Sequence, residues 1–419
     1  MAVAELNPPI VDAGCRPRIL SLSCVYPNPI LPGLGLFVRR RLQHLSMHAD
    51  VKVISPLAVF QYGGPAGARV RTGDGRCPAR RQDGLLEVMH PRWFYPPMGG
   101  SLNALLLASQ LIGPMTRLKK RFPFEVIDAH FGYPDGIAAA LLGKALAVPF
   151  TITLRGNETL HATSRLTRRW MRWALSSADR VFTVSDRLRQ FAIDLGADPA
   201  KVKTIPNGID AEVFYARDRI ASREKHGFDP HLPLIVSAGA LIERKGHHKA
   251  VRAVRSLISK GTNVQLAIVG GPGAEGQYEQ EIRRTVSSLS LEDSVRFIGS
   301  VSPDAMAEIM SCADLLCLPS TREGWPNVVH ESLACGTPVV ATDVGAVPDM
   351  LPDPRYGFVV PANDQQALDL AVKTAVQKAW DRDLIAKWGQ NRSWHRVAEE
   401  VAKEIQSVLG ERRTRVGVL

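Results

Sequence analysis

Two glutamates, eight residues apart, lie in the segment REGWPNVVHESLACGTPVVATDVGAVP, which spans residues 322–348. Pro326 suits the first turn of a helix, because its missing N–H is no loss there. Glu323 then precedes the helix and Glu331 lies inside it. The backbone N–H groups of Asn327 and its neighbours are free to hold an anion, and carboxylates accept hydrogen bonds from sugar hydroxyls. One helix start could therefore bind both a sugar and a phosphate.

A basic pair, Arg244 and Lys245, follows another short apolar run. A lysine in a strand-to-helix loop can place positive charge on a departing diphosphate. His130 ends a third apolar run, where it can bond a hydroxyl of a ligand or simply cap its strand. The loop around Gly35 lacks the third glycine of a dinucleotide fingerprint, since Val38 stands there, so a nicotinamide site is excluded. This loop either closes over a phosphate or an acceptor, or is a plain turn.

The alternation of short apolar runs with amphipathic stretches predicts the elements that hold these residues. Apolar, β-branched runs bounded by Pro, Gly or Asp are typical of strands, and the stretches between them are typical of helices. Strands are expected over residues 18–24, 51–55, 125–130, 150–154, 180–184, 202–205, 234–238, 264–269, 295–298, 315–318, 339–341 and 357–360. In the first half, helices are expected over residues 39–47, 135–146, 164–176 and 186–195. This order predicts an α/β protein whose parallel sheets are covered on both faces.

The length of 419 residues predicts two domains, because a single compact core rarely grows so large. The alternation pauses at the turn-rich segment PNGID, residues 206–210, and then restarts. We therefore expect one Rossmann-like domain over residues 1–212, a second over 213–390, and a C-terminal helix and tail over 391–419. Ligands bind at the carboxyl ends of strands in doubly wound sheets, so two facing domains predict a site in the cleft between them.

The composition excludes several other classes of protein. Apolar residues make up 45% and charged residues 22%, as in soluble globular proteins. The six cysteines form no C-x-x-C pair, which argues against a disulfide framework or a cysteine metal site. No apolar stretch reaches the ~20 residues that span a bilayer, and no signal-peptide pattern is visible, so a cytoplasmic protein is expected. The net charge of +11 indicates an anionic partner, unless it only aids solubility.

The whole segment 322–348 resembles the E-x7-E signature of the retaining glycosyltransferases of family 4. Four other stretches resemble the family in the same order along the chain: GLGLF at 33–37, the segment 128–157, IPNGIDAEVF at 205–214 and AGALIERKG at 238–246. The resemblance covers residues from about 18 to 405. It implies the GT-B fold, in which two Rossmann-like domains face each other across a cleft. The N-terminal domain would then bind the acceptor and the C-terminal domain a nucleotide-sugar donor.

The resemblance also assigns roles to particular residues. It implies that His130, Lys245 and Glu323 act in catalysis. It implies that the donor is bound by Gly35, Arg244, Lys245, Glu323, Gly324, Trp325, Pro326, Asn327, Val328 and Glu331. Within that set, Glu323 would hold hydroxyls of the donor sugar, Glu331 the ribose and Lys245 the diphosphate. The sequence departs from the family at Ala240, where an arginine is usual, and Arg244 is the candidate to replace its charge. It departs again at residues 155–158, where RGNE replaces the more frequent His-Gly-x-Asp.

The reaction that the resemblance implies is transfer of a sugar, with retention, from a nucleotide-diphosphate sugar to a hydroxyl of a glycan or a lipid-linked acceptor. The nucleotide sugar would be a co-substrate, and no other cofactor and no nucleic acid partner is expected. No metal is expected either, because the D-x-D at residues 381–383 lies in a charged helical stretch. Two alternatives stay open: an inactive scaffold of the same fold, and a sugar-nucleotide epimerase, for which no acid/base set is apparent.

A possible membrane contact comes from the segment 165–175. Four arginines recur there at helical spacing beside apolar residues: Arg165, Arg168, Arg169 and Arg172, with Leu166, Trp170 and Trp173. A basic amphipathic helix that carries tryptophan can lie on anionic lipid, which would place a cytoplasmic enzyme at the inner face of the membrane. The alternative is that both tryptophans pack on the sheet while the arginines face water.

Overall fold

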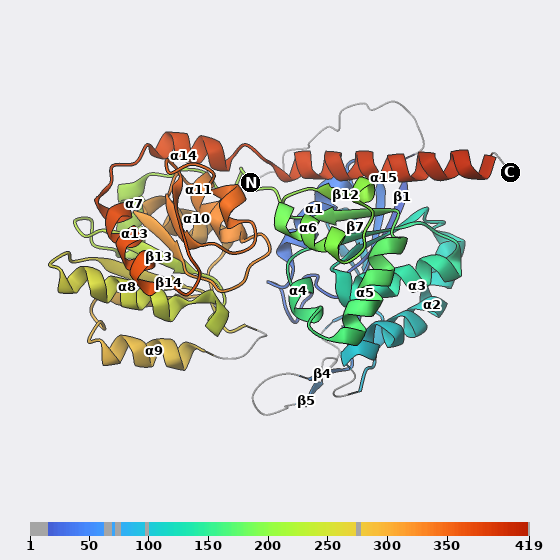
Figure 1. Ribbon diagram of the computed structural model, residues 1–419, viewed down its shortest axis with the longest axis horizontal. Helices are drawn as coiled ribbons and strands as arrows, with labels where there is room; N and C mark the ends of the chain where they lie inside the picture. Colours follow the sequence, from blue (N-terminus) through green and yellow to red (C-terminus); the bar gives the residue numbers. More distant parts are fainter. Residues whose placement is uncertain (1–15, 63–68, 72–76, 97–99, 274–277, 418–419) are drawn as a thin grey trace.

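The computed structural model describes residues 16–62, 69–71, 77–96, 100–273 and 278–417. It contains two α/β domains, which lie side by side in Figure 1 with the C-terminal domain on the left. The chain passes between them twice, and the two crossings touch through a bridge between Ile209 and Ser393. The predicted fold class, two doubly wound α/β domains, is confirmed. The boundaries at residues 212 and 390 stay a prediction.

The N-terminal domain is built on an eight-stranded sheet with the order β12-β11-β10-β9-β1-β2-β7-β6. Every neighbouring pair in it is parallel except the β6–β7 hairpin. Its strands are β1 (Arg18–Leu22), β2 (Asp50–Ile54), β6 (Arg80–Asp83), β7 (Leu86–Met89), β9 (Val126–His130), β10 (Phe150–Leu154), β11 (Arg180–Thr183) and β12 (Val202–Thr204). Two small sheets pair β3 (Leu57–Ala58) with β8 (Arg92–Trp93) and β4 (Phe60–Tyr62) with β5 (Arg69–Arg71).

The C-terminal domain is built on a six-stranded, fully parallel sheet. Its order is β15-β14-β13-β16-β17-β18, so that the chain moves outward from β13 in one direction and then from β16 in the other. This is the Rossmann strand order, in which the reversal point is the place for ligands. The strands are β13 (Leu234–Ala238), β14 (Gln265–Val269), β15 (Val295–Gly299), β16 (Leu315–Leu318), β17 (Val339–Thr342) and β18 (Gly357–Val360).

Helices cover both faces of both sheets, as the near-continuous apolar strands predict. Successive strand residues point to opposite faces, so Leu20 packs with one set of helices and Ile19 with the other. In the N-terminal domain the first set is α2 (Asn103–Arg121), α3 (Ile137–Leu146), α5 (Arg165–Ser177) and α6 (Asp186–Asp194), and the second is α1 (Leu36–Leu45) with α15 (Trp394–Gly417). In the C-terminal domain one face is covered by α8 (His247–Ser259), α9 (Glu279–Ser288) and α13 (Gln365–Gln377). The other face is covered by α10 (Pro303–Cys312), α11 (Asn327–Ala334), α12 (Val347–Met350) and α14 (Arg382–Gly389).

The last helix, α15, belongs to the N-terminal domain although it follows the C-terminal domain in the sequence. In Figure 1 it runs along the top of the N-terminal domain to the C-terminus. Its buried face, which includes Trp394, Val401 and Ile405, packs against α1 and the sheet. Arg180 of β11 adds ion pairs to Glu404 at 2.8 Å and Glu411 at 2.6 Å. The helix therefore anchors the end of the chain on the N-terminal domain, directly after the second crossing between the domains.

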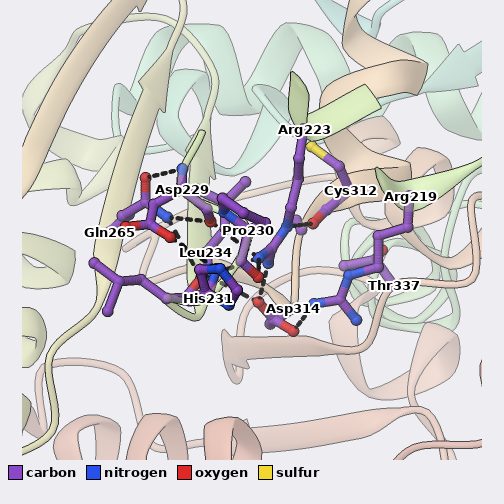
Figure 2. Close-up of polar contacts among 12 residues, drawn as sticks. Arg219, Arg223, Asp229, Pro230, His231, Leu234, Gln265, Cys312, Asp314 and Thr337 are labelled. Carbon is purple, nitrogen blue, oxygen red and sulfur yellow. Dashed lines mark hydrogen bonds and ion pairs between the residues drawn. The ribbon is translucent and has the colours of Figure 1, made fainter. Parts of the chain in front are cut away.

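Buried Arg223 closes the amino-terminal edge of the second sheet (Figure 2). It lies on the connecting helix α7 (Arg219–His226) and donates to the backbone carbonyls of Cys312, Asp229, Pro230 and Leu232. Its remaining nitrogen is 2.6 Å from Asp314, a carboxylate that also accepts from the backbone N–H of Leu234 at 2.7 Å. These contacts fix the starts of β13 and β16. A polar cluster at this edge is structural, because ligands bind at the other end of the strands.

All twelve predicted strands are present, most with ends shifted by one or two residues. The strands between residues 57 and 93 were not predicted. Trp170 and Trp173 of α5 pack against the core while the four arginines beside them are exposed, as the second alternative for that helix expected. The five cysteines in the described part are free thiols, and Cys15 lies outside it. No helix within the described residues is long and apolar enough to cross a membrane.

Candidate active site

Each sheet reverses its strand order at one point, and the loops that leave it carry the predicted site residues. In the C-terminal sheet the reversal lies between β13 and β16. The loop after β13 contains Arg244 and Lys245, in a short 3-10 turn just before α8, and the loop after β16 leads through Glu323 into α11. In the N-terminal sheet the reversal lies between β1 and β9. The loop after β1 contains Gly35, and the loop after β9 begins directly after His130. The topology thus explains why residues far apart in the sequence meet.

Lys245 and Glu323 form an ion pair across the two C-terminal loops. The lysine Nζ is 2.6 Å from the Glu323 Oε1, and the side chains are only 13% and 8% exposed. The Ser320 hydroxyl donates to the same oxygen at 2.8 Å, and the Arg244 guanidinium lies 3.6 Å from the other one. The backbone also joins the loops, since Thr321 N–H donates to the Arg244 carbonyl at 2.8 Å. Arg244, the candidate to replace the charge of the arginine missing at position 240, therefore lies next to this pair.

Buried His247 holds the loop after β13 in shape. Its Nδ1 is 2.8 Å from the Ser237 hydroxyl, and its Nε2–H donates to the Ala240 carbonyl at 3.2 Å. Burial lowers the pKa of this imidazole to about 4, so it is neutral at pH 7. The loop that carries Lys245 is thus positioned by a neutral hydrogen-bonded side chain and adds no further charge.

The two glutamates of the helix start have opposite pKa shifts. Burial alone would raise the pKa of Glu323, but the charges of Lys245 and Arg244 and the hydrogen bonds from Lys245 and Ser320 hold it below its ordinary value. Burial raises the pKa of Glu331 to about 7, and the Lys245 charge opposes this rise only in part. Glu323 is therefore ionised at pH 7, whereas Glu331 titrates there. A partly buried carboxylate with a raised pKa near a cation is typical of functional sites.

The amino terminus of α11 has no side-chain cap. Pro326 is its N-cap residue, so the helix begins at Asn327, one residue later than predicted. Uncapped N–H groups and the positive end of the helix dipole favour an anion there. This helix end lies directly after the Glu323 loop. The cluster consequently combines two cations, an uncapped helix end that suits an anion and two carboxylates.

Two glycines bring loops of opposite domains into backbone contact. A Cβ atom on Gly324 would lie 1.7 Å from the Arg155 carbonyl oxygen, and one on Gly156 would lie 2.5 Å from the Gly324 Cα. Gly156 also has φ +123°, a conformation that other residues rarely adopt. Only glycine fits at position 324 while the domains touch in this way. The structure therefore shows the cleft closed at this point.

A chain of hydrogen bonds crosses the cleft beside these glycines. His130 Nδ1 accepts from Arg155 at 3.0 Å, and Arg155 donates to the Asn207 side-chain oxygen at 3.0 Å. The Asn207 amide then donates to the side-chain oxygen of Asn327 at 3.0 Å. The buried histidine of the N-terminal domain is thereby connected to the first residue of α11. A second contact, the Arg187–Asp343 ion pair at 2.5 Å, is half exposed and contributes little.

His130 itself is fully buried between charged neighbours. Its Nε2 lies 3.4 Å from Asp128, which also pairs with buried Arg41 at 3.1 Å. Burial lowers the pKa of His130 to about 4 although Asp128 opposes the shift. Burial also lowers the pKa of Arg155 to about 9, and the Arg41 charge adds to this effect. In this conformation the neutral histidine holds Arg155 and does not reach the cleft.

The structure thus gathers most of the predicted site residues at one place. Lys245, Arg244, Glu323 and the start of α11 lie together. Gly35 lies in the other domain, as the N-cap of α1 with φ +68°, where a Cβ would meet the Val25 carbonyl at 2.4 Å. Among the described residues, no hydrogen bond or ion pair joins Gly35 to the C-terminal cluster. No three His, Cys, Asp or Glu side chains in the described part are arranged to hold a metal ion.

Two residues at the cleft were not predicted as site residues. Arg155 was only noted as a departure from the family pattern, and Asn207 only as part of a turn. The turn-forming sequence PNG at residues 206–208 marked the crossing between domains. Nothing in the local sequence indicates that Asn207 lies between Arg155 and Asn327, because these contacts join segments 52 and 120 residues apart.

Each of the two domains matches a known protein family. Residues 218–392 match the family described as Glycosyl transferases group 1, and residues 33–213 match Glycosyltransferase Family 4. The putative teichuronic acid biosynthesis glycosyltransferase TuaC of Bacillus subtilis is 27% identical over 379 residues, which are 88% of this chain and 91% of that protein. Alpha-maltose-1-phosphate synthase of Mycolicibacterium smegmatis is 25% identical over 417 residues, 93% of this chain and 99% of that protein. D-inositol 3-phosphate glycosyltransferase 2 of Catenulispora acidiphila is 32% identical over 45% of this chain, and the match spans 46% of that relative.

Solved structures share the whole architecture. Sucrose-phosphate synthase from Thermosynechococcus elongatus superposes with a TM-score of 0.74 at 19% identity, over 94% of this chain and 100% of the other. HepE from Anabaena in complex with UDP gives 0.70 at 18% identity, over 94% and 100%. These identities are too low to carry more than the fold. The two family matches follow each other along the chain and each covers one of the two domains, so this chain belongs to glycosyltransferase family 4 and has the GT-B fold.

Proposed function

We propose that this glycosyltransferase moves a hexose, with retention, from a nucleotide-diphosphate sugar to a hydroxyl of a glycan or lipid-linked acceptor, without a divalent metal. The observation that carries the proposal is the Lys245–Glu323 pair, 2.6 Å apart, beside the uncapped start of α11. Fixed cations and a helix end suit a diphosphate, and carboxylates suit hydroxyls. The complexes of HepE with UDP and with UDP-glucose support a UDP-sugar as the first donor to test.

The main requirement of this reaction is to stabilise the negative charge on the leaving diphosphate. As the bond between the anomeric carbon and the phosphate oxygen breaks, its electron pair stays on the diphosphate. Lys245, Arg244 and the α11 N–H groups then stabilise the negative charge that develops. Glu323 holds donor hydroxyls and Glu331 the ribose. The acceptor oxygen bonds to the anomeric carbon on the same face, and its proton passes to the departing phosphate oxygen.

The role of His130 in this proposal depends on Arg155. In the closed conformation the histidine accepts from Arg155 and is fully buried. Contact with a sugar hydroxyl requires the Arg155 side chain to move away. We therefore assign His130 two successive partners, Arg155 before the donor binds and a donor hydroxyl afterwards.

The proposed reaction is tested by incubating the protein with UDP-, GDP-, ADP- and dTDP-sugars and following release of the nucleotide. We expect one nucleotide class to be consumed, with the anomeric configuration kept in the product by proton NMR. Addition of EDTA should leave the rate unchanged, and loss of activity that magnesium restores would contradict the metal-independent mechanism. Interconversion of the donor without any acceptor would instead favour an epimerase. Binding of no nucleotide would favour an inactive scaffold.

Nucleotide affinity should depend on the protonation of Glu331. Its pKa is raised to about 7 by burial, so the group is neutral below pH 7 and ionised above it. The carboxylate accepts hydrogen bonds from ribose hydroxyls more strongly than the acid does. UDP affinity should therefore rise as the pH increases through 7. Calorimetric titrations from pH 5.5 to 8.5, on the order of one and a half units either side of that pKa, measure the change.

The matched variant for this titration is Glu331→Gln. It keeps the shape of the side chain but cannot ionise, so it should bind UDP more weakly, and the protein's part of the pH dependence should disappear. Any titration of the UDP phosphate remains equal in both proteins, and the difference between them isolates Glu331. Equal affinities of the two proteins at all pH values would remove the ribose assignment.

We further propose that the exposed face of α5 contacts an anionic membrane surface at the cytoplasmic side. Arg168, Arg169 and Arg172 are exposed on this helix. The Ser101 hydroxyl lies 3.0 Å from that of Ser164 and 2.9 Å from that of Thr167, which places the turn before α2 beside the start of α5. Three exposed leucines lie near this junction: Leu102 (50%), Leu160 (46%) and Leu166 (45%). Apolar side chains next to a basic face suit lipid head groups.

Binding to vesicles that contain phosphatidylglycerol should therefore depend on these arginines. Each basic residue near an anionic surface contributes about 1 kcal/mol, so the triple change Arg168→Gln, Arg169→Gln, Arg172→Gln should weaken binding about a hundredfold. Sedimentation with the vesicles measures the bound fraction. The control removes three exposed charges from the other domain: Arg252→Gln, Arg255→Gln and Lys260→Gln. Equal loss in both proteins would show a response to net charge alone.

A further inference from the structure

The N-terminal domain contains an apolar pocket of about 180 Å³ close to the reversal point of its sheet. Three short segments line it, and their contributions are Leu31 and Leu34 from the loop after β1, Leu57 and Ala58 from β3, and Trp93 and Tyr95 from the chain at β8. The first two segments leave the carboxyl ends of the neighbouring strands β1 and β2. Ligands bind at this edge of a doubly wound sheet. The pocket is therefore placed for a ligand of the N-terminal domain.

Hydrogen bonds fix two walls of this pocket. The side-chain oxygen of Asn28 accepts from the backbone N–H groups of Ile30 and Leu31, each at 3.0 Å. Phe94, between the two lining aromatic residues, donates its N–H to the Gln110 side chain of α2 and accepts from it through its carbonyl, both at 2.8 Å. The pocket is consequently formed before any ligand arrives, as is usual for small-molecule sites.

The lining offers no charge to a ligand. Among the described residues that line the pocket, none has a charged side chain. Burial raises the pKa of the Cys24 thiol, which also lines it and therefore stays neutral at pH 7. The three arginines that follow the loop on α1 each pair with a carboxylate: Arg39 with Asp83, Arg40 with Asp210 and Arg41 with Asp128. These arginines are thus not available to a phosphate in the pocket.

The shape and polarity of the lining suit an alkyl chain better than a sugar ring. Trp93 and Tyr95 form an aromatic wall, with their ring centroids 4.7 Å apart. Leu31, which also lines the pocket, is 38% exposed, so the apolar surface continues to the solvent. The hydroxyls of a sugar lose their hydrogen bonds to water in such a place and need polar partners in return. An alkyl chain needs none, and gains free energy from the burial of each methylene.

The loop that lines the pocket also borders the interdomain cleft. Phe37 follows the lining residue Leu34 by three positions. Its ring meets that of Phe131 edge to face, with centroids 6.3 Å apart, and lies 5.0 Å from the Arg155 guanidinium carbon. Arg155 belongs to the hydrogen-bond chain that crosses the cleft. A molecule with one end in the cleft can therefore extend past this loop and bury its other end in the pocket.

We propose that the pocket binds the apolar part of the acceptor, so that the preferred acceptor is a sugar attached to an alkyl chain, as in a lipid-linked glycan, rather than a plain glycan. This inference rests on the proposed transfer reaction and narrows the acceptor class that the reaction leaves open. The volume of 180 Å³ holds about six groups of the size of a water molecule, and a methylene group is of similar size. The pocket takes the first carbons of the chain, next to the sugar.

The test uses n-alkyl β-D-glucosides from methyl to octyl, below their micellar concentrations, with the full-length protein and saturating UDP in the donor cleft. In calorimetry, Kd should fall about fourfold for each added methylene until the pocket is full, and then level off. A Kd that does not change with chain length would overturn the proposal.

Two variants locate the chain in this pocket. Leu31→Asp places a carboxylate in the apolar lining at a partly exposed position, and should weaken binding of hexyl glucoside at least about tenfold. Ala58→Leu fills the pocket without adding charge, and should remove the gain from the longer chains while leaving methyl glucoside unaffected. The control is Leu85→Asp, which adds the same charge at a 77% exposed leucine of the same domain and should bind as wild type does. The same dependence on chain length in all four proteins would place the chain elsewhere and overturn the proposal.

Turnover separates this inference from the proposed reaction. Release of the nucleotide from the donor sugar is compared with methyl glucoside and hexyl glucoside as acceptors, and we expect a lower KM for the hexyl compound. Equal KM values for the two would overturn the acceptor pocket and leave the transfer reaction intact. A protein that binds the longer glucosides more tightly but binds no nucleotide would contradict the proposed function, and the acceptor role of the pocket with it.

Discussion

Lys245→Ala is expected to lower kcat/KM about 10²–10³-fold, because a fixed positive charge on the departing diphosphate is lost from a largely buried site. The same change should weaken binding of the preferred nucleoside diphosphate, since Lys245 is 13% exposed and no other lysine was assigned to the cluster. It also leaves Glu323 without its 2.6 Å partner. Calorimetry with UDP, GDP, ADP and dTDP, on wild type and variant, measures the binding effect directly.

The control for this variant is Lys260→Ala. Lys260 follows α8, the helix that Lys245 precedes, but its side chain is exposed, so the variant loses the same charge at a distance from the cluster. We expect wild-type affinity and turnover. If Lys245→Ala bound its nucleotide as well as Lys260→Ala does, the diphosphate would have to be held by Arg244 and the α11 amides alone. That outcome would remove Lys245 from the mechanism and leave the helix end as the anion site.

The strands and the C-terminal cluster were predictable because they depend on local patterns. An apolar run such as residues 315–318 indicates a buried strand wherever its partners lie, and β16 covers those four residues. The Rossmann order then brings the loops after β13 and β16 together without further information. The ion pair between Lys245 and Glu323 follows from this topology, although the residues are 78 positions apart.

The strands between residues 57 and 93 were not predicted, because each is only two to four residues long. β6 has the sequence RRQD and pairs only with β7. It lies at the edge of the sheet, where a strand does not need an apolar face. The pair Asp83-Gly84, where β6 ends and the turn begins, is a hairpin sequence that could have indicated this turn. The bonds of Arg155 and Asn207 could not be predicted from any local pattern. They depend on the relative position of the two domains, and the hydrophobic periodicity of a single helix or strand gives no information about that position.

Gly324→Ala is expected to lower kcat/KM about a hundredfold while leaving each domain folded. The three atoms nearest to the new Cβ belong to the other domain: the Arg155 carbonyl oxygen at 1.7 Å, its carbon at 2.6 Å and the Gly156 Cα at 3.0 Å. Contacts this short force the loops apart, and a displacement of about 1 Å in a catalytic arrangement can cost about 10²-fold. Gly324 is not among the residues with positive φ, so alanine is not strained once the loops separate.

The expected signature of this variant is a loss of closure without a loss of stability. The melting temperature should stay within about 2 °C of wild type, as for a surface substitution in a large protein. Small-angle scattering with the preferred nucleotide should give a larger radius of gyration than for wild type. Gly410→Ala in α15 is the control, since its Cβ would meet no atom within 4 Å. Unchanged turnover in Gly324→Ala would mean that the two loops do not touch during catalysis. The hydrogen bonds from His130 through Arg155 and Asn207 to Asn327 would then belong to a resting state, and the donor would have to be held by the C-terminal domain alone.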